Sequence, residues 1–526
     1  KNVIVLSESY AEKYFGSKNP VGKTLYVNVE KIYEVAGVVK DPPRNSDFPL
    51  HIIIPIAGPR QTPGWGSVSS AVQCFIRVPD NFNVQSFENS LQQFMKKYME
   101  PEDYENKTMT LQSMEEIHFN NNYSNITNTI FTKDKITTLS LVGILLLVIS
   151  CINFINLKTA LTSIYFKEIG IRKVLGSSRL QIALRFFGET FLLVVFSIVI
   201  SLVLLEIFLP QLEFFTGYSL ALTQIGSLNI FLFLLAVAVV TSLLAGLYPS
   251  LFISSLQPGK ALRANINTST GSIPVRKVLV IFQFVVSEVL IIGTLVVYNQ
   301  LNYLQNVDMG FDKTSVLEIS LPDNEESIIK RFKEQLLASS SIENISYSNT
   351  GTASPNTWSG DASILDRSQN LKFNSQIKFT DEDFFDTYKI ELLAGENFNK
   401  NSTDTTYVIN QTFVERMGLK NDYLSAIGTY VSIWGRKGRI IGVVIDFNTT
   451  SLVDKVSPVL ITNYRKLYNL AGIRINTVDI KSTVEYVENV FEKVYPDFVI
   501  DYEFLDKTIE QFYEDEILFS RLMITF

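Results

Sequence analysis

Cysteine and histidine are scarce in this chain of 526 residues, which has two of each. Cys74 lies in the N-terminal region and Cys151 in an apolar run, so we expect no disulfide framework. His51 and His118 are far apart and lack the spacing of metal ligands, which argues against a zinc site. We identify no acid pair or nucleophile–base set. The sequence therefore predicts no catalytic residue, metal or cofactor.

A nucleotide-binding loop is also missing, although one segment resembles it. In GSKNPVGKT, residues 16–24, five residues separate Gly16 from Gly22, whereas a P-loop has four residues between its glycines. The residues that follow alternate and are rich in Val and Tyr, which predicts strands. A phosphate site would need a helix N-terminus there. We therefore expect a structural turn at Gly22 and no ATP site.

The chain has no excess of positive charge, because its net charge is −7. This mild acidity argues against a nucleic-acid partner. The length allows several domains. The chain starts at Lys1 without a signal peptide and ends within an apolar segment, so we expect it to be a piece of a longer protein.

Long apolar runs, in contrast, dominate the middle of the chain. Four of them are close to the roughly 20 residues that a helix needs to cross a bilayer core. They are residues 136–155, 190–209, 230–248 and 278–297. Buried helices of a soluble protein are the alternative, but such helices are rarely so uniformly apolar. We expect four transmembrane helices, and the apolar rise from Ile517 predicts the start of a fifth.

Basic residues set the expected orientation. Residues 158–185 contain six basic residues and one acidic residue, and residues 249–277 contain four basic residues and no acidic residue. The loop between the second and third runs has neither Lys nor Arg. The positive-inside rule places both basic loops in the cytoplasm and residues 1–135 and 298–516 outside. The basic residues are Lys158, Lys167, Arg172, Lys173, Arg179, Arg185, Lys260, Arg263, Arg276 and Lys277.

The two outside regions resemble each other. Gly22 matches Gly428 and Gly37 matches Gly442 within a shared order of strand, short helix, glycine turn, strand, and a strand that ends in Gly-Val-Val. The second copy has no counterpart of Lys23, so a nucleotide site would explain only one copy. We expect two duplicated extracytoplasmic modules of mixed α/β type, each with a tight glycine turn.

The first basic loop, YFKEIGIRKVLGSSRLQIALRFFGET, is the most informative segment. Its charges and spaced apolar residues predict an amphipathic helix flat against the membrane, then a helix that turns into the second span. Gly176 would end the first helix, and Ser177 or Ser178 would cap the next. From charge alone, an ordinary basic loop that only sets topology remains an alternative.

Within this loop, KEIGIRKVLGSS strongly resembles the signature of FtsX/MacB-type ABC transporter permeases. Ser177 in place of alanine is the only visible departure. LAGLYPSLFISSLQPGKALR, residues 244–263, resembles the end of that family's membrane domain, and the outside regions resemble its periplasmic core domain. The resemblance covers nearly the whole chain.

The resemblance implies an α-helical transmembrane protein with two extracytoplasmic α+β domains similar to the MacB periplasmic core. Residues 1–135 and 298–516 would form these domains. Residues 136–297 would form the membrane domain, and residues 517–526 the start of a truncated further helix. The protein would be a multi-pass protein of the bacterial inner membrane, in contact with lipid.

In that family the permease binds no ATP, and a separate ATPase subunit docks on its cytoplasmic side. The resemblance implies that ATP hydrolysis drives efflux or extraction of a substrate at the periplasmic side. It leaves open a periplasmic adaptor and a homodimer. By resemblance, the docking contact would be formed by Glu168, Ile169, Gly170, Arg172, Lys173 and Gly176. Gly170 would permit close approach, and Arg172 could pair with a carboxylate through two hydrogen bonds.

Two other functions remain open. The chain could be a non-transporting transmitter that activates a cell-wall hydrolase or another extracytoplasmic partner. It could also be a membrane-anchored enzyme, but this needs a catalytic constellation that we do not find.

Two acidic residues fall near or within the apolar runs. A charge at Glu288, in the middle of the fourth run, costs several kcal/mol unless it faces protein or water. Glu288 is therefore either a functional intramembrane charge or a hydrogen-bonded side chain that holds helices together. Glu189 lies at the cytoplasmic end of the second run, where we expect it to meet water.

Overall fold

A computed structural model describes residues 2–525, apart from residues 28–30, 44–45, 47, 56–71, 100, 102–103, 105–106, 121–122, 124–129, 217–226, 256–274, 366–370, 400–404 and 477–478. Lys260 and Arg263 of the second basic loop therefore lie outside the described residues. The chain divides into two compact units. The α/β unit comprises Lys1–Ile130 and Asn302–Asp515, and the helical unit comprises Phe131–Leu301 and Glu516–Phe526.

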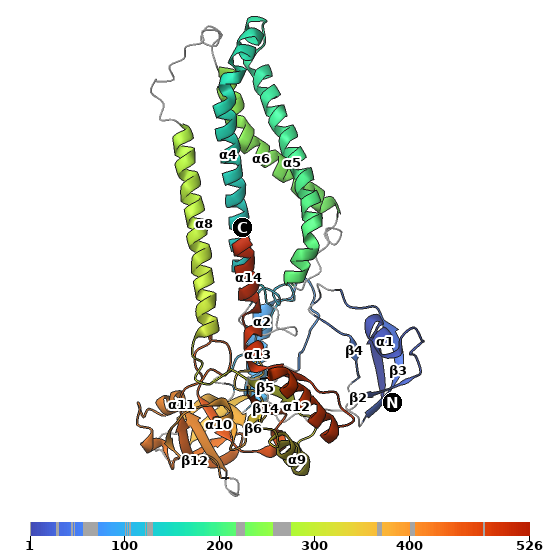
Figure 1. The fold of residues 1–526 in the computed structure, drawn as a ribbon, viewed down its shortest axis with the longest axis vertical. Helices are drawn as coiled ribbons and strands as arrows, with labels where there is room; N and C mark the ends of the chain where they lie inside the picture. Colours follow the sequence, from blue (N-terminus) through green and yellow to red (C-terminus); the bar gives the residue numbers. More distant parts are fainter. Residues whose placement is uncertain are drawn as a thin grey trace. The chain divides into compact units, whose positions relative to one another are not determined.

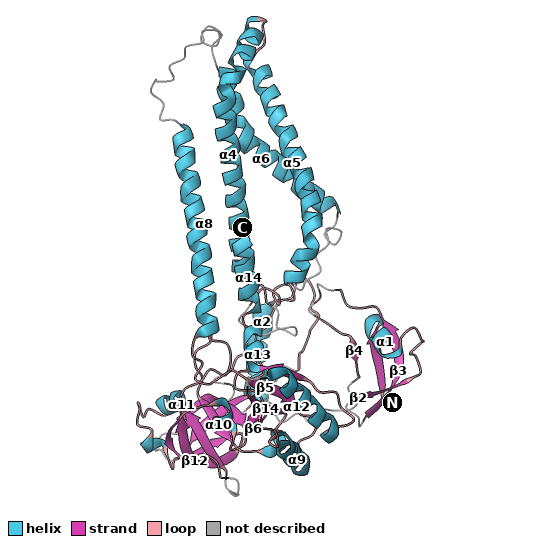
Figure 2. Cartoon of the chain, viewed as in Figure 1, coloured by secondary structure: helices cyan, strands magenta, loops and turns pink. Residues whose placement is uncertain are grey.

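Four long helices make up most of the helical unit (Figures 1 and 2). They are α4 (Lys133–Val174), α5 (Arg179–Thr216), α6 (Ser227–Ser255) and α8 (Val275–Asn306). Each contains a stretch that is long and apolar enough to cross a membrane, with mean hydropathy between 2.4 and 3.0. The four predicted membrane-spanning helices are thus confirmed as helices. A further helix, α14 (Glu514–Thr525), covers the apolar rise at the end of the chain.

The prediction of a separate surface helix in the first basic loop is wrong, because α4 is one continuous helix of 42 residues that includes this segment. Proline does not occur between Lys133 and Val174, and Gly170 is accommodated inside the helix. At 1.5 Å per residue such a helix extends about 63 Å, roughly twice the thickness of a bilayer core. The basic end of α4 therefore continues well beyond one membrane-spanning length.

Small residues allow α6 to approach the neighbouring helices closely. Ala238, Ser242 and Ala245 of α6 are almost fully buried. A Cβ atom at Gly246 would lie only 3.2 Å from side-chain atoms of both Phe187 and Thr190 in α5. Glycine at this position therefore permits the packing between α5 and α6.

The N-terminal part of the α/β unit contains a four-stranded sheet with the order β2-β3-β1-β4. Strand β1 pairs in parallel with β3, and the other pairs are antiparallel. Its small core consists of Ile4, Leu6, Ala11 and Val35. The elements are β1 (Val3–Ser7), α1 (Glu8–Phe15), β2 (Thr24–Val27), β3 (Lys31–Val39), β4 (Ile52–Ile53) and α2 (Val84–Tyr98).

The C-terminal part contains a barrel and a separate sheet. The larger sheet has the order β10-β13-β8-β7-β11-β12-β9, and β10 also pairs with β12, which closes six strands into a barrel. We call this the barrel lobe. Its elements are β7 (Ser359–Ile364), β8 (Leu371–Phe379), β9 (Leu392–Gly395), β10 (Thr406–Asn410), α11 (Gln411–Arg416), β11 (Tyr430–Ile433), β12 (Arg436–Val444) and β13 (Val459–Thr462).

The second sheet, which we call the sheet lobe, has the order β15-β5-β14-β6. Helices α9 and α12 cover one face, where Phe332 and Phe491 lie with their ring centroids 6.1 Å apart. The short helix α10 packs against β6 and β14. The elements are β5 (Val316–Ser320), α9 (Glu326–Leu336), β6 (Ile342–Ser348), α10 (Phe384–Tyr388), β14 (Leu470–Ile475), α12 (Ile480–Val494), β15 (Tyr502–Phe504) and α13 (Leu505–Gln511).

The predicted repeat is confirmed in the strand pairing. The order β1-α1-β2-β3-β4 recurs as β10-α11-β11-β12-β13, and the parallel pairs β1–β3 and β10–β12 share the same shift in register. Gly22 and Gly428 have φ angles of 82° and 90°. Their N–H groups donate to the carbonyl oxygens of Val35 and Ile440, at 2.9 and 2.8 Å. The segment at residues 16–24 is therefore followed by a strand, as expected.

The repeat also extends to side chains that the sequence comparison did not match. Ser9 at the start of α1 bonds to Asp41 through its N–H and hydroxyl groups, and Thr412 bonds to Asp446 in the same way at the start of α11. Asn83 caps α2 as Asp479 caps α12, each accepting from a serine N–H three residues later. The two copies thus share their helix-capping chemistry.

Candidate functional site

The turn between α4 and α5 has well-defined caps. Gly176 has a φ of 95°, which glycine adopts without strain. The N–H of Ser177 donates to the carbonyl oxygen of Arg172 at 3.0 Å, which is the long hydrogen bond of a Schellman motif. Ser178 and Gln181 form a capping box at the start of α5. The predictions that Gly176 ends one helix and that Ser178 caps the next are confirmed.

Glu168 links the two helices that flank this turn. Its carboxylate lies 2.9 Å from Arg172 on α4 and 3.1 Å from Arg185 on α5. All three side chains are about half exposed. Each ion pair therefore contributes at most about 1 kcal/mol, and their main effect is to fix the angle between the helices.

Beneath the ion pairs, the turn has a small apolar core. Ile169 and Ile182 are 1% and 4% exposed, and Phe186 packs against them. Gly170, next to Ile169, is also buried. Ile169, Gly170 and Ile182 are thus enclosed within the protein, whereas Phe186 is only partly buried.

Lys173 connects the end of α4 to the end of α6. Its ammonium donates to the carbonyl oxygen of Ser254 at 2.6 Å. Burial, with a smaller contribution from the charge of Arg179, lowers the pKa of Lys173 below its ordinary value. Together with the contacts of Glu168 and Ile169, this bond joins three helices at one corner. We call Glu168, Ile169, Lys173, Ile182 and Ser254 the corner contacts.

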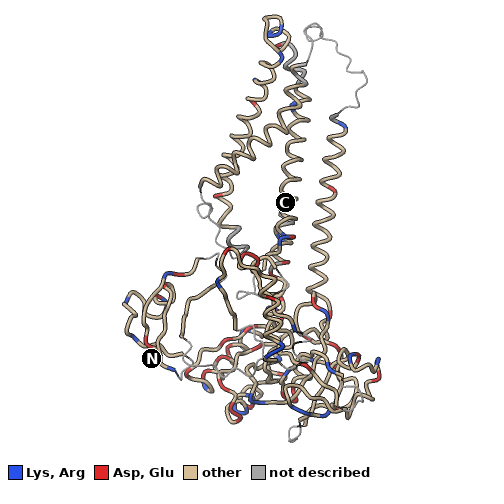
Figure 3. Tube along the Cα trace, turned by 180° about the vertical axis from the view of Figure 1, so that it is seen from behind, with Lys and Arg blue, Asp and Glu red and all other residues tan. Residues whose placement is uncertain are grey.

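The side chains that the turn does expose are mainly apolar. Val174, Leu175 and Leu180 are 69%, 79% and 68% exposed, and Ile171 and Leu184 also face solvent. We call these five residues the tip surface. Figure 3 shows that Lys and Arg residues gather at the same end of the helical unit. The tip surface was not predicted from the sequence, although the spacing of Ile171, Val174 and Leu175 places them on one helix face.

The six predicted docking residues thus fall into two groups. Arg172 and Gly176 remain accessible at the turn. Glu168, Ile169, Gly170 and Lys173 are occupied by internal contacts or buried. The structure brings all six to one helix end, and an additional apolar surface stands beside them.

Glu189 does not simply meet water. Its carboxylate pairs with the ammonium of Lys158, which is largely buried between the helices. The side chain of Glu189 is 43% exposed, so it does meet solvent as expected, and it also pairs with Lys158 of the adjacent α4. The side chain of Glu288 is exposed on α8. Its functional role stays a prediction.

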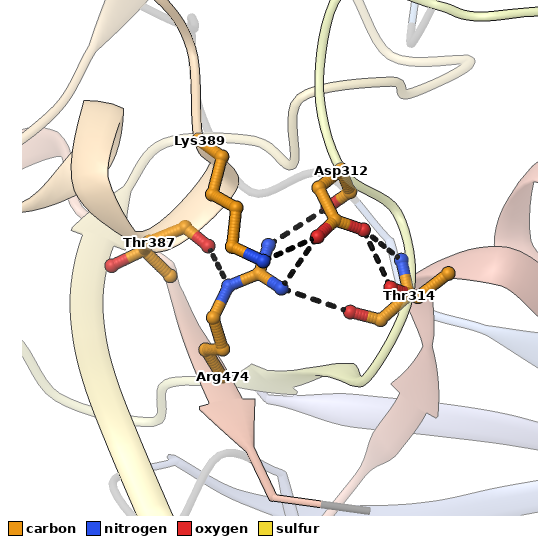
Figure 4. A network of polar contacts seen from close by, with 5 residues as sticks. All are labelled: Asp312, Thr314, Thr387, Lys389 and Arg474. Carbon is orange, nitrogen blue, oxygen red and sulfur yellow. Dashed lines mark hydrogen bonds and ion pairs between the residues drawn. The ribbon is translucent and has the colours of Figure 1, made fainter.

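A second polar cluster lies where the chain leaves α8 and enters the α/β unit (Figure 4). Arg474 of β14 donates to Asp312 Oδ2 at 3.1 Å, to the carbonyl oxygen of Asp312 at 2.9 Å and to that of Thr387 at 2.5 Å. Lys389 approaches the same carboxylate at 2.7 Å. Burial alone would raise the pKa of Asp312, but hydrogen bonds from Lys389 and Thr314 and the charge of Arg474 hold it well below its ordinary value.

Two hydrogen bonds attach one loop to the two chain segments that connect the α/β unit with the helical unit. The N–H of Asn448 donates to the carbonyl oxygen of Met309 at 2.9 Å, just after α8. The N–H of Leu452 donates to the hydroxyl of Tyr513 at 2.8 Å, just before α14. Tyr513 is almost fully buried. Residues 446–452 therefore hold the segments that follow α8 and precede α14.

Comparison with protein families yields two matches. Residues 140–258 match the model of the FtsX-like permease C-terminal domain, and residues 1–94 and 288–490 match that of the MacB-like periplasmic core domain. No curated protein matches the chain.

Among solved structures, the chain is similar to a periplasmic region, an extracellular domain and a further domain of a permease. The periplasmic region of MacB from Actinobacillus actinomycetemcomitans is 14% identical, with a TM-score of 0.28, covering 39% of this chain and 95% of that one. The extracellular domain of the noncanonic ABC-type transporter YknZ from Gram-positive bacteria is 15% identical, with a TM-score of 0.26, and the match covers 36% of this chain and 98% of that one. A domain of a permease protein from Porphyromonas gingivalis is 16% identical, with a TM-score of 0.24, and the match covers 31% of this chain and 75% of that one.

Proposed function

We propose, because this chain belongs to the family of FtsX/MacB-type permeases, that it couples ATP hydrolysis by a separate ATPase subunit to work on a substrate outside the membrane. Membership makes the chain a permease of the ABC-transporter type in general terms. The ATPase partner, the efflux or extraction of a substrate and the location in the bacterial inner membrane are our proposal.

The observation that supports the proposal best is the tip surface. Five apolar side chains at the end of a helix pair are costly to leave in water, and a partner protein would remove them from it. The basic residues around them predict a cytoplasmic location. We propose that the tip surface, with Arg172 and Gly176, contacts the ATPase.

The corner contacts give the second part of the proposal. We assign Glu168, Ile169, Gly170 and Lys173 to holding α4, α5 and α6 together, so that a force on the tip moves the three helices as one body. Ion pairs and a buried apolar contact resist separation of the helices better than a flexible loop would. On this view these four residues affect coupling without touching the partner directly.

A photoreactive crosslinking amino acid at position 175 tests the docking assignment. With an ABC-type ATPase partner co-expressed, we expect a crosslinked product of the two chains. The matched control is position 424, because Leu424 is 75% exposed and lies in the α/β unit. A crosslink from position 424 and none from position 175 would overturn the assignment.

The alternative function, a transmitter that moves no substrate, shares this coupling. The attachment of both connecting segments to residues 446–452 favours transmission of motion in either case. Substrate that copurifies with the complex would support transport. Binding of a cell-wall hydrolase to the α/β unit would support the transmitter.

A further inference from the structure

The barrel lobe and the sheet lobe share one apolar core, but a polar patch lies beside it at their boundary. In the sheet lobe Glu318 of β5 lies opposite Gly472 of β14, which in turn lies opposite Ser346 of β6. Their neighbours Leu317, Ile319 and Tyr347 belong to the apolar core under α9 and α12. Because side chains alternate along a strand, Glu318 and Ser346 face away from this core. Polar residues thus line the opposite face of the sheet.

A short segment that connects the two lobes crosses this polar face. Residues 349–353, which we call the strap, run from β6 toward β7. A Cβ atom at Gly351 would collide with the carboxylate of Glu318, so glycine lets the strap lie directly against it. On the barrel side, Lys378 of β8 donates to the carbonyl oxygen of Gly351 and to Thr350 Oγ1. The strap therefore lies between a buried acid and a buried base.

Several hydroxyl groups at the same boundary have no protein partner within the described residues. They belong to Ser346, Ser348, Thr352 and Thr380, all fully buried. Ser348 and Thr380 face each other across an isolated β-bridge between the two lobes. Buried hydroxyl groups are normally hydrogen-bonded, and water is the usual partner where protein supplies none. The polar patch is therefore less cohesive than the shared apolar core beside it, and exposing the patch to water is correspondingly less costly.

The charged groups at the boundary respond to pH near neutrality. Burial raises the pKa of Glu318 to about 7, against a hydrogen bond from Tyr388 of α10 and the charge of Lys378, while Glu503 of β15 raises it further. Burial lowers the pKa of Lys378 to about 8. Burial also raises the pKa of Asp381 to about 7. The charge of Lys333 lowers this pKa, and the charges of Asp383 and Glu382 raise it further.

We propose that the strap is a proton-dependent hinge between the two lobes, which stays closed against the sheet while Glu318 is neutral and opens when Glu318 is ionised and hydrated. The strap is the segment that is released, because Glu318 and Lys378 hold it from its two sides. This inference does not depend on the ATPase or on the tip surface.

The direction follows from the difference between closed and open states. Glu318 binds its proton more tightly when closed, so its stabilisation is fully present below its ordinary pKa and is lost as pH rises through about 7. Asp381 acts in the same direction. Lys378 acts in the opposite direction, since its contribution is lost as pH falls through about 8. From these values Glu318 and Asp381 each increase opening about tenfold between pH 6 and pH 8, and Lys378 reduces the combined increase about twofold.

Hydrogen exchange measured by mass spectrometry on the full chain in nanodiscs tests the hinge. After correction for the intrinsic pH dependence of exchange, we expect the strap and α10 to open more than tenfold more often at pH 8 than at pH 6. In E318Q, which keeps an oxygen acceptor for Tyr388, the pH 8 to pH 6 ratio should fall about tenfold. E343Q is the control, because Glu343 is exposed on the same lobe.

Exchange in α9 and α12 reports whether E318Q remains folded. The hinge is supported if this core stays protected while the pH response of the strap falls. It is overturned if the ratio in E318Q equals that of the unmodified chain, or if the unmodified chain shows no rise at the strap. If E318Q fails to fold, the pH dependence of exchange at the strap in the unmodified chain still tests the hinge by itself.

Discussion

Arg474 shows, at the scale of single residues, how one buried side chain joins segments that are distant in sequence. Its partners Asp312 and Thr387 are 162 and 87 residues away. A sequence without an alignment contains no signal for such pairs, so the cluster could not be predicted. Gly176 and Ser178 could be predicted, because caps depend on residues that are close in sequence.

Replacing Arg474 by methionine should destabilise the α/β unit by about 3 kcal/mol, because the Asp312 carboxylate and three carbonyl groups lose their buried donor. The measurement is thermal unfolding of the full chain in detergent, followed by near-UV circular dichroism. R439M is the matched control, since Arg439 is exposed on β12, and it should change stability by less than about 0.5 kcal/mol. Equal losses of stability in R474M and R439M would show that the Arg474 cluster does not stabilise the α/β unit.

At the scale of elements, the helices and the repeat were predictable for different reasons. Uniform apolar runs mark α4, α5, α6 and α8 in any context. The repeated strands could be recognised because two copies of one pattern support each other. The extension of α4 to Val174 was not predicted, since charged residues such as Glu168 and Arg172 suggested a separate surface helix. In the structure they pair with each other and with Arg185, so the helix continues through them.

The turn after α4 supplies a prediction at this scale. G176V should strain the turn, because its φ of 95° is unfavourable for a β-branched residue, at a cost of about 1–3 kcal/mol. No neighbouring atom lies within 4 Å of the new Cβ, so the effect should be conformational and not steric. We expect faster hydrogen exchange in residues 172–182.

The control for this substitution is G188A. Gly188 lies inside α5, also has no atom within 4 Å of an added Cβ, and should gain about 1 kcal/mol of helix propensity. Exchange of residues 172–182 should be unchanged in G188A. If G176V left exchange unchanged as well, Gly176 would not be needed for the turn.

At the scale of the whole molecule, the two natural cysteines provide a test of topology. Cys74 is exposed in the α/β unit and Cys151 is buried in the helical unit. We predict that a membrane-impermeant maleimide labels Cys74 in intact spheroplasts and leaves Cys151 unlabelled until the protein is denatured. Labelling of Cys74 only after permeabilisation would place the α/β unit on the cytoplasmic side and reverse the orientation.

The central claim is that a separate ATPase transfers force to the chain at the tip surface. The most direct measurement is ATP hydrolysis by the ATPase reconstituted with the permease in nanodiscs. The account predicts that L175S lowers the stimulation of hydrolysis at least tenfold while L424S, equally exposed but in the α/β unit, leaves it unchanged. Full stimulation with L175S, or hydrolysis by the purified chain alone, would contradict the account.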